Sequence, residues 1–156
     1  MHDFQSAPSA DDLRRLLLEH ALQQVLFRYA RACDERDWDA MDQVFVPHCT
    51  ADYGRWHCAD RDAIVDMIRQ HLGGCGPTQH LLGNVIVEPW GDGWRSRASV
   101  RAAHRGAGER KTLRYDALGE YTDDWIATSE GWRIVHRRMH MALEIGDRSV
   151  LRASMD

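Results

Sequence analysis

The chain has 156 residues, a formal net charge of -4 and a pI near 6.1. Its hydrophobic content of 44% suffices for one compact domain with a closed pocket, and its length is too short for two ordinary domains. The acidic balance removes the basic surface on which binding to a nucleic-acid backbone depends, so we expect no nucleic-acid partner.

The N-terminal residues MHDFQSAPSADD lack the basic start and the apolar run of a secretory signal. No apolar stretch approaches the roughly 20 residues that span a bilayer. We therefore expect a soluble, cytoplasmic protein without a membrane partner. The four cysteines follow no CxxC spacing, which favours free thiols in a reducing compartment.

Histidines and cysteines are the residues to consider for a metal site. Two adjacent His-Cys pairs at 48–49 and 57–58 offer side chains suited to zinc, as do His136 and His140. Neither set has the spacing of a zinc finger or an HExxH motif, so we predict no metal site. The sequence also has no GxSxG, P-loop or GxGxxG motif, and we expect no cofactor.

A long amphipathic helix is predicted near the N-terminus. Residues 1–8 are expected to form a disordered leader that ends at Pro8, and Ser9 then stands as an N-cap before two aspartates. From there we predict a helix of about 22 to 26 residues. Its apolar stripe consists of Leu18, Leu22, Val25, Tyr29 and Cys33.

Two shorter helices follow in the prediction. Asp37 is expected to cap the first of them and Pro47 to end it. Its inward side chains would be Trp38, Met41, Val44 and Phe45. After an extended piece at 50–53, Asp60 or Asp62 opens the next helix, which closes at glycines 73 and 74.

The second half of the chain has the period of strands. Turn signals separate four predicted strands, which span residues 78–89, 94–105, 111–128 and 131–145. The second strand alternates between small or apolar residues and arginines, which is typical of an antiparallel sheet with one packed face and one wet face. Helices followed by such a sheet indicate an α+β fold, with a single domain over residues 9–148 and a C-terminal tail over 149–156.

The candidate chemistry rests on one carboxylate and one histidine. Asp34 stands where the first helical pattern stops, and His80 stands at the start of a predicted strand. A carboxylate that orients an imidazole gives a general base usable near neutral pH, provided that the fold brings the two together. The structural alternatives are a solvated Asp34 and a partly buried His80 bonded to a backbone carbonyl.

Further residues are candidates for a pocket. His104 lies on the apolar face of its strand beside small alanines, although a lone core histidine is an equal reading. Tyr29 lies on the apolar stripe of the first helix, where its hydroxyl needs a partner. Tyr115 and Tyr121 share one strand face with small residues between them, as a ligand cavity would require.

Two segments resemble the SnoaL-like branch of the NTF2-like superfamily. They are CDERDWDAMDQVFVPHCTADY at 33–53 and TQHLLGN at 78–84. Within that branch the chain is similar to scytalone dehydratase and to the bacterial bile acid 7α-dehydratases, and the resemblance covers nearly the whole domain. It implies an NTF2-like cone-shaped barrel, in which a strongly bent antiparallel sheet wraps around three N-terminal helices and leaves an apolar cavity.

The resemblance also implies roles for individual residues. His80 would remove a proton next to a carbonyl while Asp34 holds its ring, as in the Asp and His dyad of a dehydrochlorinase of this family. His104 matches the second pocket histidine of scytalone dehydratase, and Tyr53 matches one of its two water-holding tyrosines. Tyr29 matches a tyrosine of the bile acid dehydratases.

Substrate contacts are expected from a second group. Cys33 replaces the other water-holding tyrosine of scytalone dehydratase, and Tyr121 falls near the position of its pocket asparagine, so the resemblance implies a different substrate outline. The predicted substrate-binding residues are Tyr115, Tyr121, Asn84 and Cys33.

These features predict a cofactor-independent lyase that dehydrates a hydrophobic cyclic ketone or β-hydroxy carbonyl compound, with His104 or the returned proton helping hydroxide to leave. The alternatives are a ketosteroid-type isomerase, a polyketide cyclase, or a non-catalytic small-molecule-binding or accessory domain. The resemblance implies a homo-oligomer, either a dimer or a trimer. Tryptophans expected near the outer face of the sheet suit self-association, namely Trp90, Trp94, Trp125 and Trp132.

Overall fold

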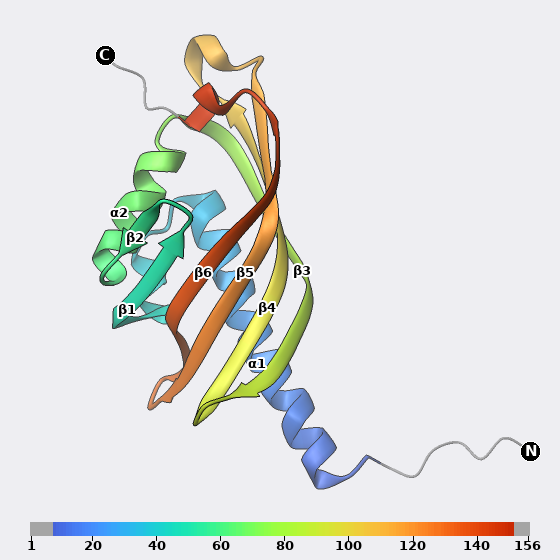
Figure 1. Ribbon diagram of the computed structural model, residues 1–156. Helices are drawn as coiled ribbons and strands as arrows, with labels where there is room; N and C mark the ends of the chain where they lie inside the picture. Colours follow the sequence, from blue (N-terminus) through green and yellow to red (C-terminus); the bar gives the residue numbers. More distant parts are fainter. Residues whose placement is uncertain (1–7, 152–156) are drawn as a thin grey trace, which may run out of the picture.

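The computed structural model describes residues 8–151, which form two α-helices, three short 3-10 helices and one six-stranded sheet (Figure 1). The predicted leader at 1–8, apart from its last residue, and positions 152–156 of the predicted tail lie outside this described part. The strands lie in the order β2-β1-β6-β5-β4-β3. The sheet curves around α1, and α2 lies beside β1 and β2.

Helix α1 spans Ala10–Glu35, which confirms the predicted N-terminal helix. The Ser9 hydroxyl accepts a hydrogen bond from the Asp12 backbone N–H at 3.1 Å, and the Asp12 carboxylate accepts from the Ser9 backbone N–H at 2.9 Å. This reciprocal capping box satisfies two of the N–H groups that an open helix end leaves unpaired. The buried face consists of Leu22, Val25, Leu26, Tyr29, Ala30, Ala32 and Cys33.

The second predicted helix is shorter than expected. It is a single 3-10 helix, η1, over Asp39–Gln43, and strand β1 already begins at Phe45 and runs to Tyr53. Pro47 therefore lies inside a strand instead of ending a helix. It sits where the pairing of β1 with β6 shifts register, between Phe45 and Thr50, so its missing N–H removes no regular ladder bond.

A hairpin and the second α-helix complete this half of the chain. Strand β2, Trp56–Cys58, pairs antiparallel with β1 and was absent from the prediction. Helix α2 spans Arg61–Leu72, and the Asp60 carboxylate caps it by accepting from the Ala63 N–H at 2.8 Å. It ends at Gly73, as predicted.

Four long strands form the main part of the sheet. They are β3 (Cys75–Trp90), β4 (Gly93–Gly106), β5 (Arg114–Thr128) and β6 (Gly131–Gly146), each antiparallel to the next. The α+β class and the bent sheet packed around N-terminal helices are thus confirmed. Two details differ: β1 runs parallel to β6, and the sheet stays open, with β2 and β3 as its edges.

A bulge in β3 reverses the alternation of its side chains. Asn84 has a φ of 50°, and the pairing with β4 shifts register between Gly83 and Ile86. In a regular strand, Leu82 and Val87 would lie on opposite faces, because an odd spacing separates them. Both are nevertheless buried, since the bulge lies between them. Asn84, one of the predicted substrate-binding residues, is therefore exposed at the bulge.

The tryptophans do not form the predicted outer surface. Trp125 is buried and its indole N–H donates to the Ser96 hydroxyl at 2.9 Å, while Trp94 and Trp132 are partly buried against the core. Of the four, Trp90 alone is exposed. A homo-oligomer remains a prediction that rests on the resemblance.

The chain continues after β6 into a short 3-10 helix, η3, at Arg148–Leu151. Val150 is fully buried there and packs with Ala102, Tyr115 and Ala117. This contact closes the end of the sheet above the cavity described below. No helix of residues 8–151 is long and apolar enough to cross a membrane.

Candidate active site

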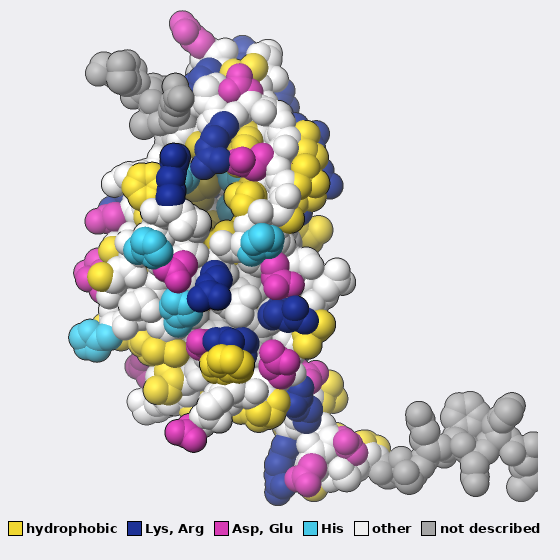
Figure 2. Space-filling view, viewed as in Figure 1, with side chains coloured by type: hydrophobic (Ala, Val, Ile, Leu, Met, Phe, Trp, Pro, Cys, Tyr) yellow, Lys and Arg dark blue, Asp and Glu magenta, His cyan; other side chains and the backbone are white. Residues whose placement is uncertain are grey.

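A cavity of about 650 Å³ opens between the concave face of the sheet, α2 and η3. Its volume falls within the range of small-molecule sites. Figure 2 shows the hollow, with basic side chains at its rim and histidine deeper inside. The apolar part of its lining includes Met67, Ile68, Leu72, Ala102, Ala117 and Met139. The polar part includes His80, His104, Tyr29, Tyr53, Tyr121 and Tyr115.

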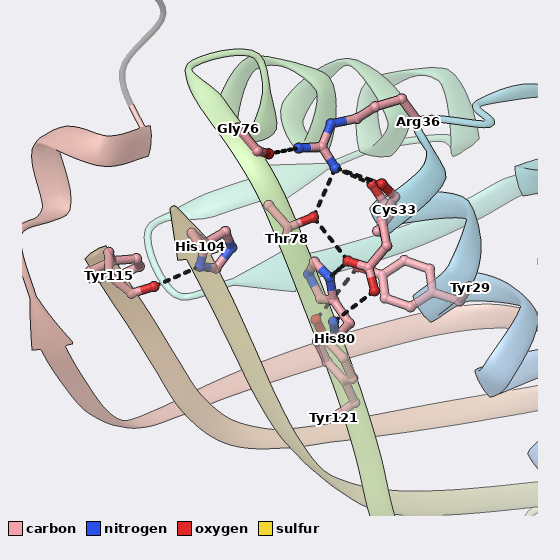
Figure 3. Close-up of polar contacts among 10 residues, drawn as sticks. Tyr29, Cys33, Arg36, Gly76, Thr78, His80, His104, Tyr115 and Tyr121 are labelled. Carbon is pink, nitrogen blue, oxygen red and sulfur yellow. Dashed lines mark hydrogen bonds and ion pairs between the residues drawn. The ribbon is translucent and has the colours of Figure 1, made fainter. Parts of the chain in front are cut away.

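The fold brings Asp34 and His80 together. Asp34 lies in the last turn of α1 and His80 near the start of β3, and Asp34 Oδ1 is 2.7 Å from His80 Nδ1. Asp34 Oδ2 accepts the backbone N–H of His80 at 2.9 Å. The Thr78 hydroxyl is a third donor, 2.9 Å from Oδ1 (Figure 3). The His80 side chain is only 7% exposed, so its ring is enclosed by protein.

These contacts define the protonation of the pair. Burial raises the pKa of the Asp34 carboxyl, but hydrogen bonds from His80 and Thr78 outweigh it and hold that pKa below its usual value. An ionised carboxylate only accepts hydrogen bonds, so Nδ1 of His80 carries the hydrogen. The lone pair of the neutral ring is then at Nε2, which makes Nε2 the basic nitrogen.

His104 is held differently. Its Nδ1 donates to the Tyr115 carbonyl at 3.1 Å, and its ring lies 5.7 Å from the His80 ring, edge to face. Burial, with a smaller contribution from the His80 charge, lowers the pKa of His104 to about 4. Near neutral pH His104 is therefore uncharged, and its Nε2 is an acceptor that has no proton to give.

Three tyrosines form a hydroxyl cluster in the cavity. The Tyr29 hydroxyl lies 3.4 Å from that of Tyr53 and 3.5 Å from that of Tyr121. Burial raises the pKa of all three, so they stay protonated near neutral pH. A cluster of neutral hydroxyls in an enclosed site can donate to an oxygen on which negative charge develops.

A buried arginine that we did not predict lies under this cluster. Arg137 is fully buried, and its guanidinium is 4.2 Å from the Tyr29 ring centre and 4.1 Å from that of Tyr121. It donates to both carboxylate oxygens of Asp123, at 2.7 and 2.8 Å. Its Nη1 is buried without a hydrogen-bond partner among the described residues. The sequence gives no local signal for this pair, because a register shift between Asp124 and Trp125 is what sets Asp123 opposite Arg137.

The predicted substrate-binding residues divide into two groups. Tyr115 and Tyr121 line the cavity, and the Tyr115 hydroxyl donates to Glu144 near the mouth. Cys33 is fully buried behind Tyr29 and does not line the cavity; burial raises the pKa of its thiol to about 12. Asn84 is exposed at the bulge and also lies outside the cavity. Neither Cys33 nor Asn84 therefore contacts the space for a substrate.

Two of the candidate zinc ligands, His57 and His136, have other hydrogen-bond partners. His57 hydrogen-bonds to Asp52, and His136 Nδ1 lies 2.7 Å from the Thr50 hydroxyl. Within the described part of the chain, no three His, Cys, Asp or Glu side chains gather as metal ligands.

The fold and the cavity define an α+β domain of the NTF2-like class. The family model described as a SnoaL-like domain matches residues 14–138, and the chain belongs to this family. It is 35% identical over 118 residues to an uncharacterized protein of Mycobacterium tuberculosis, covering 74% of this chain and 80% of that protein.

Solved structures share the fold at lower identity. A provisionally assigned scytalone dehydratase from Novosphingobium aromaticivorans has a TM-score of 0.77 and 20% identity, over 85% of this chain and 89% of that chain. A hexachlorocyclohexane dehydrochlorinase from Novosphingobium barchaimii has a TM-score of 0.74 and 13% identity, over 87% of this chain and 94% of that chain. An NTF2-like superfamily protein from Salmonella enterica has a TM-score of 0.73 and 16% identity, over 83% of this chain and 94% of that chain. At these identities the likeness concerns the fold alone.

Proposed function

We propose that the protein is a cofactor-independent lyase that removes water from a hydrophobic cyclic ketone or β-hydroxy carbonyl compound. The observation that carries the proposal is the Asp34–His80 pair, which presents a basic nitrogen in an apolar cavity that also holds the tyrosine hydroxyls. Proton removal next to a carbonyl needs these two elements, a base and donors for the resulting oxyanion.

In the first step, His80 Nε2 takes the proton from the carbon beside the carbonyl. The electron pair of the broken C–H bond moves into the carbonyl, and the enolate oxygen accepts from the hydroxyl cluster of Tyr29, Tyr53 and Tyr121. The buried charge of Arg137 beneath the cluster stabilises the negative oxygen at short range in a medium of low dielectric. Asp34 stabilises the imidazolium that forms at His80.

In the second step, the enolate returns its electron pair and the bond between the β-carbon and the hydroxyl oxygen breaks. The departing hydroxide takes the proton from the His80 imidazolium and leaves as water, which regenerates the base. His104 has no proton to supply near neutral pH, so its neutral Nε2 instead accepts from the substrate hydroxyl and orients it. The returned proton, rather than His104, is therefore the acid in this proposal.

The names of two structural neighbours support elimination over the alternatives. A dehydratase loses water and a dehydrochlorinase loses hydrogen chloride, so both names describe removal of a proton and a leaving group. A largely apolar cavity into which the Asp34-oriented His80 presents its basic nitrogen suits the same type of reaction.

The test is turnover by the purified full chain of hydroxy-ketosteroids, hydroxylated tetralones and β-hydroxy ketones, followed by absorbance of the new conjugated enone at neutral pH. His80→Ala is the inactive variant. His140→Ala, which removes an exposed histidine of β6, is the matched control and keeps the rate. The expected result is enone formation that His80→Ala abolishes.

Three results would contradict the proposal. Enone formation unchanged in His80→Ala would remove His80 as the base. Tight binding of several compounds, with no product by absorbance or mass spectrometry, would favour a small-molecule-binding domain. A product that has kept the mass of the substrate, through shift of a double bond or ring closure, would favour an isomerase or a cyclase that uses the same base.

A further inference from the structure

The residue that ends α1 has an unusual backbone for its type. Arg36 has φ 60° and ψ 28°, in the left-handed region that glycine occupies without strain. Its backbone N–H donates to the Ala32 carbonyl and so caps the helix. Because glycine would serve the cap better, the presence of arginine points to a role for its side chain.

The guanidinium of Arg36 joins the end of α1 to the start of β3. Its Nη1 donates to the Thr78 hydroxyl at 2.9 Å, and its Nη2 donates to the Gly76 carbonyl at 3.2 Å. It also donates to the carbonyl of Cys33 in its own helix. Figure 3 shows the Arg36 side chain reaching Thr78, which precedes His80 by two residues on β3.

The chemistry of the donors sets the direction of these bonds. An arginine only donates hydrogen bonds, so the Thr78 oxygen accepts from Arg36. The hydroxyl of Thr78 has a single hydrogen, and Asp34 Oδ1 lies 2.9 Å from that oxygen. Because the Thr78 oxygen accepts from Arg36, its hydroxyl hydrogen is left to donate to the Asp34 carboxylate, which holds the His80 ring.

We infer that Arg36 is a positioning residue for the Asp34–His80 pair, acting through the Thr78 hydroxyl. Arg36 itself does not line the cavity and has no contact with the space for the substrate. Its effect on a reaction rests on the function proposed above, whereas its effect on the orientation of the pair does not.

The variant Arg36→Gly separates the two roles of this residue. Glycine keeps and relaxes the left-handed cap, so helix α1 is retained. The bonds of the guanidinium to Thr78 and Gly76 are lost, together with those to the helix carbonyls of Cys33 and Asp34. The variant Thr78→Val removes the hydroxyl at nearly constant shape. Arg31→Ala is the matched control, since Arg31 lies on the exposed side of α1 and pairs with the exposed Glu35.

The first measurement is the tautomer of the His80 ring, by nitrogen NMR of the full chain carrying 15N-labelled histidine. The His80 signal is identified by its absence in His80→Gln. In the native protein we expect one signal set for the Nδ1–H tautomer. In Arg36→Gly and in Thr78→Val we expect a second set for the Nε2–H tautomer, and none in Arg31→Ala.

The second measurement is kcat on a compound that the native enzyme converts. We expect about a tenfold fall in each variant with KM changed less than twofold, the size of effect typical of a group that orients a reacting side chain. The double variant should lose no more than either single one, since both remove the same link.

Three outcomes would overturn the inference. They are a His80 signal unchanged in both variants, a change in Arg36→Gly that Thr78→Val does not reproduce, and losses of kcat that add in the double variant. If Arg36→Gly does not fold, Arg36→Asn replaces it, since asparagine tolerates the left-handed backbone and lacks the guanidinium. If no compound is converted, the proposed function fails, and the NMR measurement still decides the role of Arg36.

Discussion

Asp34 contacts His80 at two places, since one carboxylate oxygen lies 2.7 Å from the ring Nδ1 and the other 2.9 Å from the backbone nitrogen of the same residue. The end of α1 thus fixes both the ring and the strand from which the ring projects. Because three donors surround the carboxylate, it stays ionised and His80 keeps its Nδ1–H form. The pair is therefore oriented before any substrate arrives.

Replacing Asp34 by asparagine is the first prediction. The amide has one oxygen and one NH2 group, so when its oxygen accepts the His80 backbone N–H, its NH2 faces Nδ1. The ring then carries its hydrogen at Nε2 and cannot take a proton there. We expect Asp34→Asn to lower kcat roughly ten-thousandfold, the scale seen when a buried aspartate loses control of a histidine tautomer.

Steady-state kinetics and urea denaturation together test this prediction. Asp37→Asn, at an exposed aspartate just after α1, is the control and should keep the native rate. Asp34→Asn should still fold, although the Thr78 hydroxyl loses its acceptor, so we expect the free energy of unfolding to fall by only about 1 kcal/mol. Native kcat in this variant would contradict the assigned role.

Removing single hydroxyls from the tyrosine cluster is the second prediction. We expect Tyr53→Phe and Tyr121→Phe each to lower kcat by roughly tenfold to a hundredfold, because each removes one donor to the enolate oxygen. Tyr115→Phe is the comparison, since its hydroxyl is engaged by Glu144 at the mouth and its loss should raise KM more than it lowers kcat. Equal effects on kcat and KM in all three variants would argue against an oxyanion site.

Local rules predicted much of the fold from the sequence. Ser9 and Asp60 cap the helices where predicted, because capping chemistry involves residues only three positions apart. The four long strands appear because their period and turns are also local. The Asp34 and His80 contact joins residues 46 positions apart, and the resemblance, rather than the period, pointed to it.

Non-local pairing explains what the sequence alone did not predict. Phe45 forms part of β1 because Ile134 on β6 offers it a partner, which overrides the helical pattern before Pro47. Asn84 turns outward because a bulge inverts the alternation of β3. Arg137 was not singled out, because an arginine is seldom fully buried unless it is paired, and its partner Asp123 lies on the neighbouring strand.

The pH dependence of stability is the third prediction and concerns His104. Its pKa is lowered from 6.5 to about 4 in the folded state by burial and by the His80 charge. The unfolded chain therefore binds this proton first as pH falls, so stability is fully present above pH 6.5 and is lost as the pH approaches 4. From this group alone we expect the free energy of unfolding to be about 2 kcal/mol lower at pH 5 than at pH 7.5.

Urea denaturation of the native chain and of His104→Gln at the two pH values measures this contribution. Glutamine can still donate to the Tyr115 carbonyl but does not titrate, so the difference in unfolding free energy between the two pH values should shrink by that amount. An identical pH dependence in both proteins would show that His104 titrates normally in the folded state.

The buried pair of Arg137 and Asp123 supports the fourth prediction. Burial opposes the charge of Arg137, but the attraction of Asp123 outweighs it and raises the pKa of Arg137 well above its usual value. Removing the arginine leaves a buried carboxyl without its partner. We expect Arg137→Met to destabilise the fold by about 3 to 5 kcal/mol, measured by urea denaturation.

A second substitution separates stability from function at this pair. In Arg137→Met with Asp123→Leu, no buried charge is left unpaired, so much of the lost stability should return. The rate should not return, because the charge beneath Tyr29 and Tyr121 is still missing. Recovery of both stability and kcat in the double variant would mean that Arg137 serves only to balance Asp123, and the stabilisation of the enolate would then rest on the tyrosine hydroxyls alone.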